Sequence, residues 1–215
     1  MNDREHADMK KGLIFDLDGV ICFTDRYHYL AWKALADRIG VPFDETINDR
    51  LRGVSRMASL EIILERSERI YSPEEKLAMT EEKNQRYRRL LESMSPADLS
   101  DEVRDTLLEL RRRGYRLGIG SSSRNTKYIL ERVGLYDMFD AISDGTNISR
   151  SKPDPEVFLK AAEYLSEDPK NCIVVEDAYS GIDAAKAAGM TAVGIGDAAG
   201  YDKADMRIDS LTELL

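Results

Sequence analysis

Two aspartates, Asp16 and Asp18, stand on either side of one leucine, directly after the apolar run at residues 12–15. Residues two apart in an extended chain point to the same side, so we expect the two carboxylates to lie close together. Gly19 lets the backbone turn away just after them. Two like charges that close need a cation or a shared proton. Since open α/β sheets bind ligands at the carboxyl ends of their strands, the pair predicts a functional site.

Three more polar stretches follow predicted strands or lie in the loops after them. They are Ser121-Ser122-Ser123-Arg124-Asn125, Ser151-Lys152-Pro153 and Glu176-Asp177. Serine hydroxyls and backbone N–H groups at the start of a helix form a natural anion site, and Lys152 adds a point charge. Oxygen ligands without histidine or cysteine suit Mg²⁺; the candidates are Asp16, Asp18, Glu176 and Asp177.

Taken together, these groups supply what phosphoryl transfer needs: a metal, hydroxyls, a lysine and a spare carboxylate. A carboxylate can itself be the nucleophile and form an aspartyl phosphate. Each stretch alone has an ordinary explanation as a turn, a helix cap, a surface loop or a solvated strand end. Parallel strands, however, bring all four to one sheet edge. The glycines at residues 194–200 have the wrong spacing for a dinucleotide fingerprint, and no Walker A motif is present.

The elements that must position these groups alternate along most of the chain. Strands are predicted at residues 12–18, 115–120, 139–143, 171–175, 191–195 and 206–208, and helices at 101–113, 124–133, 154–165 and 178–188. Residues 24–94 show only helical signals. The predicted fold class is α/β: a doubly wound (Rossmann-like) parallel-sheet core with an inserted all-helical cap domain. The core, residues 1–23 and 95–215, is called the sheet unit. The cap domain, residues 24–94, is called the helical insert.

Composition narrows the class of protein. The 215 residues are 42% hydrophobic, enough for a sizeable core, and the formal net charge is −9. A net negative surface argues against nucleic acid or an anionic membrane as the main partner, so an anionic substrate needs a local positive site. Cys22 and Cys172 lie in apolar surroundings, so we expect both to be reduced cysteines that pack in the core. Without an apolar leader or membrane-length run, we expect a cytoplasmic protein.

The four polar stretches resemble, in order and spacing, the four motifs of the haloacid dehalogenase superfamily of phosphotransferases. The position of the helical insert resembles members that carry a cap between the first and second motifs. The resemblance covers nearly the whole chain. Within the superfamily it is strongest to the hexose-phosphate mutases, on the stretches at residues 16–21, 27–36, 53–56, 83–84, 95–98 and 151–153.

This resemblance implies roles for individual residues. Asp16 is expected to be the nucleophile and Asp18 the general acid/base, with Glu176 and Asp177 completing the Mg²⁺ site. Thr24 would lie at the hinge between the two units and His28 near Asp18. The transferred phosphoryl group would be held by Ser121, the Ser122 backbone and Lys152. The second phosphate and the sugar would be held by Gly53, Ser55, Arg56, Lys83, Asn84, Ser123, Arg124 and Asn125.

The implied reaction interconverts β-D-glucose 1-phosphate and glucose 6-phosphate, through an aspartyl-phosphate enzyme and β-glucose 1,6-bisphosphate, which also primes the enzyme. Three residues depart from the family pattern: Arg124 replaces a lysine, Ser122 an alanine and Phe23 an aspartate. Two alternatives stay open. One is a capped sugar-phosphate phosphatase, or a mutase for another hexose phosphate. The other is a non-catalytic sugar-phosphate binding protein. We expect a monomer that acts on a small sugar phosphate.

Overall fold

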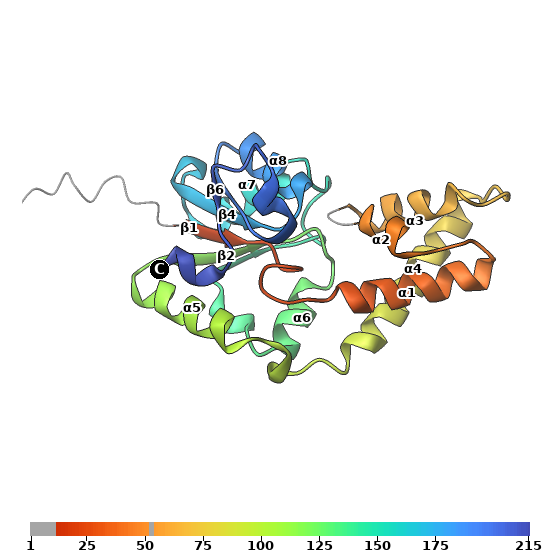
Figure 1. Ribbon diagram of the computed structural model, residues 1–215, viewed down its shortest axis with the longest axis horizontal. Helices are drawn as coiled ribbons and strands as arrows, with labels where there is room; N and C mark the ends of the chain where they lie inside the picture. The colour runs from red at the N-terminus through yellow and green to blue at the C-terminus, as the bar shows by residue number, and fades with distance from the viewer. Residues whose placement is uncertain (1–11, 52–53) are drawn as a thin grey trace, which may run out of the picture.

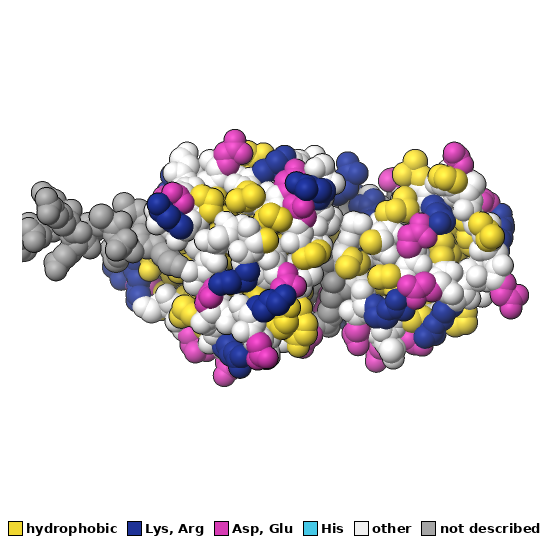
Figure 2. Space-filling view, turned by 90° about the horizontal axis from the view of Figure 1, so that it is seen from above, with side chains coloured by type: hydrophobic (Ala, Val, Ile, Leu, Met, Phe, Trp, Pro, Cys, Tyr) yellow, Lys and Arg dark blue, Asp and Glu magenta, His cyan; other side chains and the backbone are white. Residues whose placement is uncertain are grey.

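The computed structural model describes residues 12–51 and 54–215, so the predicted substrate contact at Gly53 lies outside the described residues. Figure 1 shows two lobes, a sheet flanked by helices and a separate group of helices. Acidic and basic side chains are interspersed over both lobes on the face seen in Figure 2. Within the described ranges, no helix combines the length and apolarity needed to cross a membrane.

The sheet has six parallel strands in the order β3-β2-β1-β4-β5-β6. Their bounds are β1 Gly12–Phe15, β2 Arg116–Gly120, β3 Ala141–Ser143, β4 Cys172–Glu176, β5 Thr191–Gly194 and β6 Met206–Arg207. The strand order reverses between β1 and β4, and this is the point where doubly wound sheets bind ligands. The predicted parallel α/β fold is confirmed.

Helices cover both faces of the sheet (Figure 1). Leu13 and Phe15 pack with α5 (Asp101–Arg112) and α6 (Thr126–Arg132) on one face. Ile14, which points the other way, packs with α7 (Glu156–Leu165) and α8 (Tyr179–Ala187). Because successive side chains alternate across a strand, a short apolar strand buried on both faces fits only between two helical layers.

The first strand ends earlier than predicted. Its pairing stops at Phe15 rather than at Asp18, because the backbone turns back at Gly19, whose φ is 89°. Asp18 instead forms an isolated bridge with Cys22, and the Gly19 N–H donates to the Cys22 carbonyl at 2.8 Å. Asp16 and Asp18 therefore do not sit on one regular strand.

The helical insert consists of α1 (Asp25–Ile39), α2 (Glu45–Asp49), α3 (Arg56–Leu64) and α4 (Pro73–Leu91). Gly40 ends α1 in the left-handed conformation, and Ser72 opens α4 with a reciprocal capping box to Glu75. The insert has its own apolar cluster, which includes Trp32 and Met79. Tyr87, Leu91 and Met94 instead join the cluster beneath the sheet. We propose that the sheet unit and the helical insert meet at residues 23/24 and 94/95, the same boundaries that the sequence predicts.

Candidate active site

A cleft of about 390 Å³ lies between the carboxyl edge of the sheet and the helical insert. All the predicted site residues within the described ranges line it, except Thr24, which is fully buried behind Asp18. They are Asp16, Asp18, His28, Ser55, Arg56, Lys83, Asn84, Ser121, Ser122, Ser123, Arg124, Asn125, Lys152, Glu176 and Asp177. Residues more than a hundred positions apart thus face one space.

At the floor of the cleft, Lys152 bridges two carboxylates. Its Nζ donates to Asp16 Oδ1 and, at 2.5 Å, to Glu176 Oε1. Burial by itself lowers the pKa of Lys152, but the charges and hydrogen bonds of the two carboxylates outweigh it and raise that pKa. The second Glu176 oxygen accepts the Ala178 N–H at 2.8 Å. Lys152 therefore stays charged and fixes Asp16, whose backbone N–H is held by Val175 O at 3.0 Å.

Asp18 is held by a different partner. Thr24 Oγ1 donates to Asp18 Oδ1, and the Tyr87 hydroxyl donates to Thr24 Oγ1 at 3.0 Å. Burial raises the pKa of Asp18 to about 6, although the Thr24 hydrogen bond opposes the rise. A carboxyl group with such a pKa is suited to exchanging protons near neutral pH. The two aspartates of the first motif therefore differ in environment: one faces a lysine, the other a hydroxyl.

The carboxylates of the cleft form an oxygen-only donor set. Burial, together with the negative charges of nearby Glu176 and Asp18, raises the pKa of Asp177 to about 7. Burial also raises the pKa of Asp16, whose carboxylate neighbours oppose Lys152. Among the described residues, no three acidic, histidine or cysteine side chains alone are close enough to enclose a metal. Hard oxygen ligands that repel one another still match Mg²⁺, which takes one or two carboxylates plus water and phosphate.

Two glycines make room for these carboxylates. A Cβ at Gly19 would lie 2.1 Å from Asp177 Oδ2, and one at Gly181 would lie 1.9 Å from Glu176 Oε1. No side chain fits at either position unless the carboxylate moves. The acidic groups are therefore packed directly against backbone on the side away from the cleft, which fixes their direction.

The serine loop after β2 folds on its own side chains. Ser121 Oγ accepts the Ser123 N–H at 3.1 Å, and Ser123 Oγ accepts the Asn125 N–H at 3.2 Å. The Ser123 carbonyl accepts the Gly145 N–H at 3.0 Å, which ties the loop to the one after β3. Ser122 has a buried Oγ with no partner among the described residues. Hydroxyls and N–H groups thus line this wall of the cleft.

On the insert side, Lys83 is buried among aromatic rings. Its Nζ lies 2.8 Å from His28 Nδ1, 4.9 Å from the Trp32 ring centroid and 4.5 Å from that of Tyr87. Burial lowers the pKa of Lys83 and of His28, and each is lowered further by neighbouring cations. A neutral His28 accepts a hydrogen bond from Lys83, and Lys83 is near enough to Asp18 for that carboxylate to act on the Lys83 pKa.

A chain of hydrogen bonds joins the helical insert to the sheet unit at the other end of the cleft. Arg56 donates to Asn84 Oδ1 at 2.8 Å, and Asn125 Nδ2 donates to the same oxygen at 2.9 Å. Asn84 belongs to α4 and Asn125 precedes α6. Arg124, also lining the cleft, is near enough to lower the pKa of Arg56. This end therefore offers N–H groups and positive charge, as an anion requires.

Sequence reasoning missed three contributors. Tyr87 supports Thr24, and its place four residues after Lys83 on one helix was a usable signal. Asp25 lines the cleft, and its negative charge helps to raise the pKa of Asp18. Arg88 contacts Asn125 and Tyr128 of the sheet unit. No local pattern in the sequence distinguishes it from Arg86 and Arg89 on the same helix.

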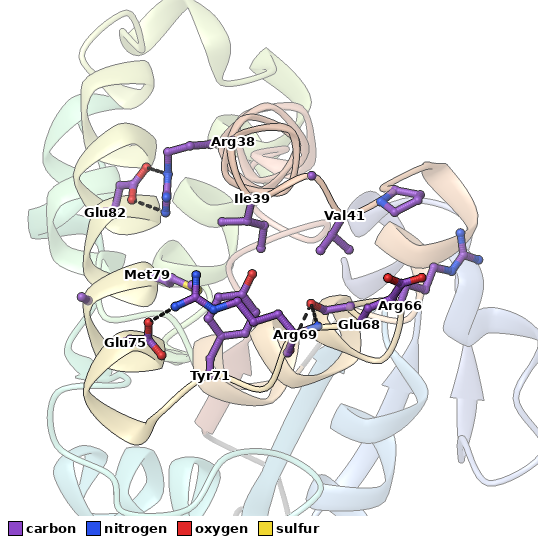
Figure 3. A pocket seen from close by; sticks show the side chains of 14 residues that line it. Arg38, Ile39, Val41, Arg66, Glu68, Arg69, Tyr71, Glu75, Met79 and Glu82 are labelled. Carbon is purple, nitrogen blue, oxygen red and sulfur yellow. Dashed lines mark hydrogen bonds and ion pairs between the residues drawn. The ribbon is translucent and has the colours of Figure 1, made fainter.

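A second, larger hollow of about 980 Å³ lies on the helical insert, between the end of α1 and the segment leading into α4. We call it the distal groove. Figure 3 shows Arg38 facing Glu82 and Arg69 facing Glu75 across it. The partners Arg38 and Glu82 lie 2.7 Å apart and are 49% and 45% exposed, so water screens them. None of the predicted site residues lines this groove.

Comparisons with known proteins agree with this geometry. The family profile described as haloacid dehalogenase-like hydrolase matches residues 10–189. The chain is 43% identical to a beta-phosphoglucomutase of Bacillus subtilis, over 95% of this chain and 91% of that protein. It is 35% identical to a fructose-1-phosphate phosphatase of Escherichia coli, over 86% of this chain and 95% of that protein. A crystal structure of beta-phosphoglucomutase from Clostridium difficile has 40% identity and a TM-score of 0.90, over 96% and 94% of the two chains.

Proposed function

Because the chain belongs to the haloacid dehalogenase-like hydrolase family, we propose that it is a β-phosphoglucomutase, which interconverts β-D-glucose 1-phosphate and glucose 6-phosphate. One observation carries the proposal. The cleft has two regions suited to a phosphate, one at Asp16 and Lys152 and the other at Arg56 and Asn125. A mutase intermediate with phosphates at both ends of a sugar needs two such regions, whereas a phosphatase needs only the first.

Asp16 is the proposed nucleophile. Its carboxylate attacks the phosphorus atom, forms an aspartyl phosphate and releases the sugar oxygen. Lys152 and the Ser121 hydroxyl hold the phosphoryl oxygens, because their donors line the floor of the cleft. When bound, Mg²⁺ would be held by Asp16, the Asp18 carbonyl, Glu176 and Asp177. It would neutralise the negative charge that develops during transfer.

Asp18 is the proposed general acid/base. It takes the proton of the sugar 6-hydroxyl as that oxygen attacks the aspartyl phosphate, and the product is β-glucose 1,6-bisphosphate. The bisphosphate then turns over and returns its 1-phosphate to Asp16, while Asp18 gives the proton back. Thr24 holds the carboxyl group of Asp18 in place through its hydroxyl. The same bisphosphate, added in trace amounts, primes the enzyme.

The helical insert favours transfer to sugar over transfer to water. Arg56, Lys83 and Asn84 all belong to the insert, so a sugar phosphate that contacts them draws the insert onto the sheet unit. Closure excludes water and completes the site only when substrate is present. All these groups come from one chain, and both cysteines are buried. We therefore also propose a monomer acting in the cytoplasm.

The test is incubation with β-glucose 1-phosphate, Mg²⁺ and a trace of the bisphosphate, with glucose 6-phosphate and inorganic phosphate measured in parallel. We expect glucose 6-phosphate to accumulate, and chelation of Mg²⁺ to abolish it. α-Glucose 1-phosphate is the control for anomer choice. Release of inorganic phosphate without glucose 6-phosphate would instead support a phosphatase, the activity named for the Escherichia coli relative. Fructose 1-phosphate and other hexose phosphates belong in the same assay.

A further inference from the structure

Four side chains form a continuous hydrogen-bonded row across the two units, and we call it the amide bridge. Arg56 donates to Asn84 Oδ1 at 2.8 Å, Asn125 Nδ2 donates to the same oxygen at 2.9 Å, and Arg88 donates to Asn125 Oδ1 at 3.4 Å. An arginine thus stands at each end, with two amides between them. The guanidinium of Arg88 also lies 4.4 Å from the centroid of the Tyr128 ring.

The end arginines fix which way both amides point. A guanidinium has donors and no acceptor, so each amide must turn its oxygen toward the arginine beside it. Asn84 Oδ1 therefore faces Arg56, and the same oxygen receives Asn125 Nδ2. Asn125 Oδ1 is then left for Arg88. Both amide oxygens accept hydrogen bonds inside the row, so the amide hydrogens of Asn84 and the second amide hydrogen of Asn125 remain to be donated to another partner. N–H donors attract a phosphate, whereas an amide oxygen repels it.

We propose that Arg88 is a positioning residue for substrate binding: it holds the Asn125 amide so that its NH₂ group, and not its oxygen, serves the anion at the insert end of the cleft. Arg88 does not line the cleft itself, whereas Asn84, Asn125 and Arg56 do. Stacking on Tyr128 holds the exposed guanidinium over the sheet unit although it belongs to α4 of the insert. The inference rests on the proposed function for the identity of the anion, the second phosphate of the sugar.

Without Arg88, only the hydrogen bond to Asn84 Oδ1 still orients the Asn125 amide, and the Asn125 oxygen loses its donor inside the row. The amide then spends part of its time turned over, with its oxygen toward the phosphate, which weakens binding of the anion. We expect Arg88→Gln to weaken binding of glucose 6-phosphate about fivefold, because an exposed stacked cation contributes modestly. Arg88→Lys keeps the charge and one donor and is expected to recover part of the loss. In turnover, KM rises by the same factor and kcat stays within about twofold, because Arg88 touches no reacting atom.

Binding is measured by the fluorescence of Trp32, the only tryptophan of the chain, which lines the cleft. Glucose 6-phosphate is titrated without the bisphosphate, so no turnover is needed. The matched control is Arg86→Gln, the same change of charge on the same helix at an exposed arginine for which the described residues show no side-chain partner. We expect the control to bind within about 1.5-fold of the parent and both variants to unfold at the parent temperature.

Equal weakening by Arg88→Gln and Arg86→Gln would overturn the inference, because net charge alone would then explain the effect. A fall in kcat with KM unchanged would also overturn it. If Arg88→Gln does not fold, Tyr128→Leu removes the stacking partner instead, and unchanged binding by a folded Tyr128→Leu variant would exclude this anchoring. If the parent makes no glucose 6-phosphate but the binding pattern holds, the proposed function fails while the role of Arg88 stands. If the parent makes glucose 6-phosphate but Arg88→Gln binds it as tightly as the parent does, the role of Arg88 fails while the proposed function stands.

Discussion

The cleft and the distal groove are both hollow and both rich in charge, but their charges are arranged in opposite ways. In the distal groove each arginine has an exposed carboxylate partner, as Arg38 has Glu82 (Figure 3). In the cleft, Lys152 serves two carboxylates, and burial raises the pKa values of Asp16, Asp18 and Asp177. Every arginine of the larger hollow has a carboxylate partner, whereas the smaller hollow is lined by more acidic than basic side chains.

This difference separates a surface feature from a site. Exposed ion pairs contribute little and call for no ligand, since water already solvates both partners. Carboxylates gathered out of water are costly until a cation compensates them. Volume alone would have selected the distal groove, whereas charge and burial select the cleft.

The strongest test of this comparison removes the nucleophile. Asp16→Asn keeps the size of the side chain but removes the attacking oxygen charge, so glucose 6-phosphate formation is expected to fall about 10⁴-fold or more. The control is Glu82→Gln in the distal groove, which should retain the parent rate. Turnover of Asp16→Asn at the parent rate would remove Asp16 from the chemistry.

The next largest effect is expected from Lys152→Met. It leaves Asp16 and Glu176 buried without their cation, so the free energy of unfolding should fall by about 3–5 kcal/mol. Turnover should fall about 10³-fold, because the phosphoryl group loses a fixed positive charge. Excess Mg²⁺ should restore part of the stability and not the rate, as measured by thermal unfolding and product formation. The control, Lys76→Met, breaks an exposed pair with Glu61 whose atoms lie 2.9 Å apart.

A smaller effect is expected from crowding the acidic wall. In Gly181→Ala the new Cβ would lie 1.9 Å from Glu176 Oε1, so the carboxylate must move away from Lys152. A displacement of about an ångström at such a site costs about 10²-fold in rate. Gly200→Ala is the matched control, because a Cβ there meets nothing within 4 Å. Equal rates for both variants would show that the position of Glu176 does not matter for turnover.

The smallest effect belongs to the distal groove. Arg69→Gln removes the partner of Glu75 and the cation over the Tyr71 ring. The free energy of unfolding should change by less than about 1 kcal/mol, and less still at high salt. KM and kcat should stay at the parent values. A change in KM above about threefold would give the distal groove a part in substrate binding and break the comparison.

Signals in the sequence were enough to predict most of the elements and the sheet edge at which the candidate site residues meet. Gly40 ends α1 and Ser72 begins α4 through capping, which depends only on neighbouring residues. Asp16, Lys152 and Glu176 meet because parallel strands share one carboxyl edge. That meeting followed from topology, which the alternation of strands and helices already indicated.

What the sequence did not predict depends on contacts between distant segments. Spacing placed Asp16 and Asp18 side by side, but their partners, Lys152 and Thr24, give them different environments. Tyr87 reaches Thr24 across 63 positions in the chain. Arg88 differs from Arg86 only because the end of α4 lies against the sheet unit, and a one-dimensional pattern does not contain that information.

Helix α4 also acts as a lever arm. Its 19 residues span about 28 Å, and its C-terminal end, at Tyr87 and Leu91, is embedded in the apolar cluster beneath the sheet. If the insert turns about Tyr87, a rotation of about 10° carries Pro73 about 4 Å, whereas Lys83, one turn away, moves about 1 Å. The residues nearest the chemistry would then travel least when the cleft opens, and the distal groove, at the far end of the arm, would travel most.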